Sequence, residues 1–160
     1  MKSQILKLLE SDARLTPNQI SIMLDTPIDE VNSCINEMEA NGTILGYKAV
    51  VDWEKTDKES VSAMIDVKLT PQRGKGFDRV AEKIYNYPEV KSVYLMSGGY
   101  DLSVLIEGKT MKEVAFFVSQ KLAPIDEVIA TTTHFVLHKY KDTGVVYDAT
   151  LDIDERGNCN

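Results

Sequence analysis

Residues 96–102 read Met-Ser-Gly-Gly-Tyr-Asp-Leu and lie between two apolar runs, residues 93–96 and 102–106. Adjacent glycines between strand-like runs predict a β-hairpin, because glycine reaches positive φ without a steric penalty. A phenol and a carboxylate, from Tyr100 and Asp101, directly follow this turn, where strand backbone and free loop amides are close. We interpret the loop as an element that binds a small molecule.

The patterns on both sides of this turn predict strands and helices in the order βαββαβ. Apolar and polar residues alternate over 61–69, which indicates a strand with one buried face. Helical spacing follows from Phe77 to Ile84, and Thr110 and Glu113 form a capping box at the start of a second helix. The remaining strands are expected over residues 90–97, 101–107 and 127–140. This order predicts a ferredoxin-like α+β domain, an antiparallel sheet with both helices on one face.

The helices of such a domain cover only one face of its sheet. The other face needs a cover, and a second copy of the same sheet supplies one of matching shape and chemistry. The sequence therefore predicts a homodimer that is joined through this face.

The first 40 residues have helical periodicity instead. A first helix is expected over residues 3–10, and Thr16-Pro17-Asn18-Gln19 supplies the cap and the capping box of a second. Thr26-Pro27 starts a third helix, which Asn41-Gly42 ends. The side chains expected to face inward are Ile5, Leu8, Leu9, Ile20, Met23, Leu24, Ile28, Val31, Ile35 and Met38. A tight turn between the last two helices predicts a helix-turn-helix; from spacing alone, a helical interaction module without a nucleic-acid role is the alternative.

Two kinds of sequence connect these regions. Strand-like residues on both sides of Gly46, within residues 43–52, predict a small β-wing or a connecting strand. The mostly charged segment that follows lacks apolar periodicity and indicates a linker. We therefore expect a helix-turn-helix domain over residues 1–51, a linker over 52–60, a ferredoxin-like domain over 61–141 and a C-terminal tail over 142–160.

Composition excludes several other classes of protein. The chain has 160 residues, of which 43% are hydrophobic and 27% charged, as in a soluble globular protein. No apolar run is long enough to span a membrane, so we expect a cytoplasmic protein with no membrane partner. Two cysteines and two histidines, with no nucleophile and base at a suggestive spacing, predict no metal site, no cofactor and no enzymatic activity.

Several motifs, taken together and in this order, resemble the Lrp/AsnC (feast/famine) transcriptional regulators. They are Gly42-Thr43-Ile44-Leu45-Gly46-Tyr47-Lys48-Ala49-Val50-Val51-Asp52, Pro88-Glu89-Val90, Gly98-Gly99-Tyr100-Asp101-Leu102 and Thr131-Thr132-Thr133. The resemblance covers residues 3–141 and implies a winged helix-turn-helix followed by a RAM-type ferredoxin-like domain. It also implies DNA as a partner, dimers joined through the C-terminal sheets, assembly to tetramers or octamers, and an amino-acid effector bound between dimers.

An amino-acid effector needs an acceptor for its ammonium group and donors for its carboxylate. Asp101 is the candidate acceptor. The candidate donors are the amides of Gly98, Gly99 and Tyr100 and the hydroxyls of Thr131 and Thr133, which share one face of a strand. The alternative is that the glycines serve only the turn, that Asp101 caps it, and that the threonines are ordinary strand formers.

The helix expected to read DNA is unusual for this class because no basic residue occurs between Arg14 and Lys48. Residues 1–60 contain six bases and eleven acids, a balance of −5. Few cations predict weak phosphate binding by each subunit. The candidate DNA-binding residues are Thr26, Asn32, Ser33, Asn36 and Lys48. Two functions stay open: a DNA-binding regulator that responds to an amino acid, and an amino-acid-sensing oligomer with weak or lost DNA binding.

Overall fold

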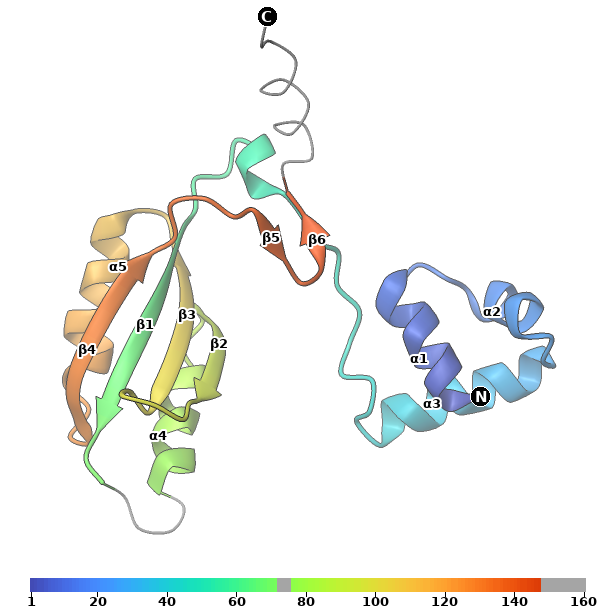
Figure 1. Ribbon diagram of the computed structural model, residues 1–160, viewed down its shortest axis with the longest axis horizontal. Coiled ribbons are helices and arrows are strands. Elements are labelled where there is room, and N and C mark those ends of the chain that lie inside the picture. Colours follow the sequence, from blue (N-terminus) through green and yellow to red (C-terminus); the bar gives the residue numbers. More distant parts are fainter. Residues whose placement is uncertain (72–75, 148–160) are drawn as a thin grey trace, which may run out of the picture. The chain divides into compact units, whose positions relative to one another are not determined.

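The computed structural model describes residues 1–71 and 76–147, which form two compact units (Figure 1). The first unit is Met1–Val51, and the second begins at Asp52. Within the residues described, no helix has the length and apolar character needed to cross a membrane. Each unit has its own hydrophobic core, so each is described by itself.

The first unit contains three helices, α1 (Lys2–Ser11), α2 (Pro17–Leu24) and α3 (Ile28–Ala40). The predicted capping box of α2 is confirmed: Gln19 N–H donates to the Thr16 hydroxyl at 3.3 Å, and Thr16 N–H donates to the Gln19 side chain at 2.9 Å. The buried core consists of Ile5, Leu9, Ile20, Val31, Cys34, Ile35 and Met38. These residues come from all three helices, so the core holds the helices together.

Two of the expected core residues of this unit are instead exposed. Met23 is 58% and Ile28 41% exposed, because each lies at the edge of the stripe that its helix turns inward. Thr26 does not cap α3: its hydroxyl donates to the Leu24 carbonyl at 3.1 Å, and Pro27 occupies the cap position. The expected α3 therefore begins one residue later than its proline, at Ile28.

The segment expected to form a wing contains no strand among its described residues 43–52. Leu45 in this segment is 95% exposed. Ile44 alone packs against the helical core. The strand-like sequence of this segment is thus not matched by strand pairing within a single chain.

The second unit has the predicted βαββαβ order, which confirms the ferredoxin-like fold. Its elements are β1 (Val61–Leu69), α4 (Gly76–Tyr85), β2 (Val90–Leu95), β3 (Leu102–Gly108), α5 (Met111–Phe117), which continues as a π turn (Val118–Leu122), and β4 (Val128–Phe135). The sheet is antiparallel with the strand order β2-β3-β1-β4. The first and last strands of this sheet, β1 and β4, therefore lie side by side, and β2 and β4 form the edges (Figure 1).

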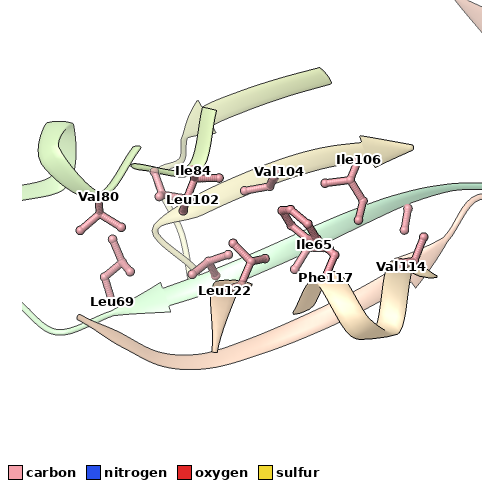
Figure 2. Close-up of a cluster of buried hydrophobic side chains, with 12 residues drawn as sticks. Ile65, Leu69, Val80, Ile84, Leu102, Val104, Ile106, Val114, Phe117 and Leu122 are labelled. Carbon is pink, nitrogen blue, oxygen red and sulfur yellow. The ribbon is translucent and has the colours of Figure 1, made fainter. Parts of the chain in front are cut away.

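The core of this unit lies between the sheet and the two helices. Alternate residues of β1 point into it, and Ile65 pairs with Val104 of β3 in the register of the sheet. Figure 2 shows these side chains, with Leu69 and Val80 at one end of the cluster and Ile106 and Val114 toward the other. One face of the sheet is therefore buried by helices, as the alternating pattern of residues 61–69 predicts.

The C-terminal part departs from expectation. The strand predicted over residues 127–140 ends at Phe135, and β5 (Lys141–Asp142) pairs with β6 (Val145–Val146) in a small hairpin. Thr143 and Gly144 form its turn with positive φ at both residues. Residues 72–75 and residues 148–160, which contain the acidic end of the tail, lie outside the described residues.

Candidate functional site

The Gly-Gly stretch forms the predicted turn between β2 and β3. Met96 N–H donates to the Asp101 carbonyl at 2.8 Å and closes the loop. Gly98 has φ +156°, and a Cβ placed at Gly98 or Gly99 would meet no atom within 4 Å. The loop is therefore open around its glycines, and Gly98 and Gly99 are both exposed.

The Asp101 side chain has a structural role that the sequence does not reveal. Its Oδ2 accepts a hydrogen bond from Leu69 N–H at 2.8 Å and lies 3.4 Å from Lys68 Nζ. Asp101 N–H also donates to the Val67 carbonyl at 3.0 Å. The carboxylate thus takes the place of a backbone acceptor at the end of the β1–β3 ladder and attaches the loop to β1.

Tyr100 connects the same loop to the far edge of the sheet. Its hydroxyl lies 2.7 Å from the hydroxyl of Thr132 in β4, and both side chains are half-buried. In the register of the sheet, Thr132 is opposite Asp66, on the face that the helices leave open. The sequence pattern predicts Thr131 and Thr133 as candidates, and Thr132, which makes this contact, is not among them.

The structure places the two predicted threonines on the other face. Thr131 pairs with Val67, and Thr133 with Ile65, whose side chains belong to the core on the helix side. Residues that are directly opposite across a ladder share a face. Thr131 and Thr133 do share a face, as expected, but within one chain that face is not the one on which Tyr100 meets Thr132.

The open face of the sheet combines apolar and charged groups. Met64 and Tyr94 are about half exposed there, at 46% and 57%. His134 Nε2 lies 3.3 Å from Asp66 Oδ2 across the β1–β4 pair. Ser103 is buried at 4% exposure near the middle of this face. The face is therefore neither uniformly polar nor covered by a helix of the described chain.

The candidate DNA-binding residues of α3 differ in exposure. Ser33 and Asn36 are exposed on the same side of the helix, whereas Asn32 is half-buried. Lys48 is exposed in the segment that follows α3. The Thr26 hydroxyl is already bonded to Leu24, so this side chain is not free to bind a phosphate in the conformation described.

Two acids of α3 have partners within the first unit. Lys2 Nζ donates to Glu37 at 2.6 Å, and this hydrogen bond raises the pKa of Lys2. The Tyr47 hydroxyl donates to Glu39 at 2.9 Å; desolvation first, and then this bond, raise the pKa of Tyr47. The Lys2 ammonium offsets the charge of Glu37, whereas the Tyr47 hydroxyl brings no positive charge to Glu39.

The chain matches two families. Residues 62–146 match the Lrp/AsnC ligand binding domain, and residues 2–44 match a winged helix-turn-helix DNA-binding domain. An uncharacterized HTH-type transcriptional regulator of Bacillus subtilis, YugG, is 51% identical over 156 residues, which is 97% of this chain and 93% of YugG.

Solved structures share the fold at lower identity. The transcriptional regulator NMB0573 of Neisseria meningitidis, in complex with L-methionine, is similar with a TM-score of 0.73 and 22% identity, covering 94% of this chain and 96% of that one. The feast or famine regulatory protein Rv3291c of M. tuberculosis, also complexed with L-methionine, has a TM-score of 0.72 and 17% identity, covering 86% and 90%.

Proposed function

This chain belongs to the Lrp/AsnC family of transcriptional regulators, and from this premise we propose that it binds DNA in response to an amino-acid effector. It is a regulator with a helix-turn-helix and an Lrp/AsnC ligand-binding domain, and it is not an enzyme. The observation that carries the effector proposal is the open loop of residues 98–101, whose glycines are exposed and whose carboxylate, Asp101, is held at the end of β1.

The chemistry of this loop suits a zwitterion. Asp101 would accept the ammonium group, and the amides of Gly98, Gly99 and Tyr100 would donate to the carboxylate. NMB0573 and Rv3291c were solved with L-methionine, which supports an amino acid as the class of effector. In this chain the ammonium group must share the Asp101 carboxylate with the Leu69 amide and Lys68.

The position of the threonines supports a site between subunits. Within one chain, Thr131 and Thr133 lie on the helix side of the edge strand β4, away from the Tyr100–Thr132 contact. They would join the effector only if the loop of a second subunit approached this edge. We therefore assign the loop and the threonine pair of one effector site to different subunits.

The open face of the sheet supports a homodimer. Met64 and Tyr94 are exposed on it, and a second copy placed there would remove both from water. Further association of dimers through the β4 edge and the effector loop would give a tetramer or an octamer. Effector binding would then alter the assembly and, through it, the spacing of the DNA-binding units.

DNA binding by this protein would rest on uncharged contacts and on avidity. Ser33 and Asn36 are exposed on α3, and asparagine can pair with adenine in the major groove. With Lys48 as the nearest following cation, each subunit would bind weakly, while an oligomer adds several such contacts. The acidic α3 also favours a second function, an amino-acid-sensing oligomer that does not bind DNA.

A binding assay on promoter DNA separates these two functions. We would measure fluorescence anisotropy of a duplex that carries the protein's own promoter, at low salt, with and without each standard amino acid. Asn36→Ala tests α3, and Asn18→Ala, an exposed asparagine on α2, is its matched control. Binding that Asn36→Ala weakens and Asn18→Ala leaves intact supports the regulator, whereas no binding at micromolar dimer favours the sensor without DNA.

A further inference from the structure

A cavity of about 400 Å³ lies in the second unit at the opposite end of β3 from the effector loop. Residues 106–109 at the end of β3, the start of β2, α5 and linker residues 58–60 form its walls. β3 contains seven residues, so the cavity and the loop are about 20 Å apart. This distance separates the cavity from the loop of the proposed effector site.

The floor of the cavity is apolar. It consists of Ile106, Val114 and Phe117, each at most 4% exposed. Figure 2 shows these three side chains at one end of the core. Gly108 leaves this floor accessible, because a Cβ there would already contact Glu113 and Val114 at 3.4 Å. An apolar ligand group of modest size therefore has a surface to cover.

The walls carry charges of both signs in equal number, four lysines and four glutamates. Some of these ions are paired with each other: Lys121 with Glu89, and Lys91 with Glu107 at 3.7 Å. The Lys109 ammonium has no charged partner among the described residues. The Glu113 carboxylate, which also lines the cavity, accepts a hydrogen bond from the Lys109 backbone N–H at 2.7 Å.

We propose that this cavity binds a small zwitterion with an apolar body, a free amino acid or a molecule with the same adjacent charges, at a second site. The ligand carboxylate pairs with Lys109 and its ammonium group with Glu113, while its side chain covers the apolar floor. The equal numbers of positive and negative wall charges disfavour a ligand with a net charge, because the wall charges of the same sign as the ligand repel it as strongly as those of opposite sign attract it. The ligand also contacts the linker that leads to the helix-turn-helix, so its binding restrains that segment.

Methyl NMR of the full chain tests this proposal at the site itself. We would label isoleucine and valine methyl groups and add each standard L-amino acid in turn, with a dicarboxylate and a diamine of similar length as charged controls. At least one apolar amino acid is expected to shift the Ile106 and Val114 signals, and both controls are expected to leave them unchanged. The absence of any shift with every amino acid, or equal shifts with the controls, overturns the proposal.

Variants then separate the cavity from the effector loop. Gly108→Met fills the cavity and should abolish the shifts, whereas the matched Gly108→Ala adds only the Cβ and should keep them. Lys109→Gln should weaken binding about tenfold, the effect of losing one charge-assisted contact. Asp101→Asn should leave the shifts intact. Shifts that survive Gly108→Met but disappear in Asp101→Asn would show transmission from the loop and overturn the second site, independently of whether the loop binds an effector.

Discussion

Replacement of Asp101 distinguishes the structural role of its carboxylate from its proposed effector role. In Asp101→Asn the side-chain oxygen can still accept the Leu69 N–H, but the charge that faces Lys68 is lost. The Lys68 side chain is 40% exposed, so this pair contributes about 0.5–1 kcal/mol. Asp101→Ala also leaves the Leu69 amide without its acceptor in a residue that is 2% exposed, which costs a further ~1–3 kcal/mol.

The effector role has a larger expected effect on affinity than on stability. A charged hydrogen bond to an ammonium group contributes about 1.5–3 kcal/mol, so Asp101→Asn should weaken amino-acid binding about ten- to hundredfold. Calorimetry with L-methionine and the other standard amino acids measures this change. Urea unfolding followed by the fluorescence of Trp53, the single tryptophan, measures the loss of stability at a fixed subunit concentration.

The control is Lys68→Gln, which removes the partner of Asp101 but keeps its carboxylate. This variant should bind the amino acid at least as tightly as the parent, because the ammonium group then has less competition for the carboxylate. Unchanged affinity in Asp101→Asn with reduced stability would show that Asp101 serves only the fold. Unchanged stability in Asp101→Ala would refute the structural role derived from the Leu69 contact.

Three further predictions concern the core, the acid limit of stability and DNA binding. Ile65→Ala in the fully buried core should lower the free energy of unfolding of the second unit by about 3–4 kcal/mol in urea titrations. The pKa of the Glu127 carboxyl lies below 4.5, chiefly because its side chain accepts a hydrogen bond from the Glu127 backbone N–H. Desolvation raises this pKa, and the nearby Arg79 and Lys83 lower it further. The stability advantage of the parent over Glu127→Gln should therefore be complete above pH 4.5 and disappear as the pH falls through the lowered pKa; a difference that persists in acid would contradict this assignment. Ser33→Lys adds a cation to α3, so the slope of log affinity for DNA against log salt concentration should become steeper by about one unit for each subunit that contacts a phosphate. An unchanged slope would show that Ser33 does not face DNA.

Most of the secondary structure can be predicted from the periodicity of apolar residues in the sequence. The alternation of residues 61–69 and the capping boxes at Thr16 and Thr110 are local signals, and the structure contains the strand and the helices that they predict. The strand that was expected to continue to residue 140 ends at Phe135, because β-forming residues alone do not show where a neighbouring strand stops. The same reason applies to residues 43–52, which have strand-like sequence but no strand to pair with in one chain.

The candidate site is harder to predict from the sequence, because it depends on the register in which the strands pair. Spacing shows that Thr131 and Thr133 share a face, but only the pairing of β4 with β1 shows that this is the helix side. The same register turns Thr132 toward the open face of the sheet, where its hydroxyl meets that of Tyr100. Leu69 is 32 residues from Asp101 in sequence, and no local pattern links its amide to that carboxylate.

The hydrogen bond between Leu69 and Asp101 would lower the affinity of the proposed effector site. A carboxylate that already accepts an internal N–H and faces a lysine attracts an ammonium group less strongly than an unpaired carboxylate, so the affinity for the amino acid would be lower. A regulator with such a site would respond only when the amino acid is abundant. The end of β1 would thereby set the threshold concentration, and substitutions there would change the response without altering any group that recognises the amino-acid side chain.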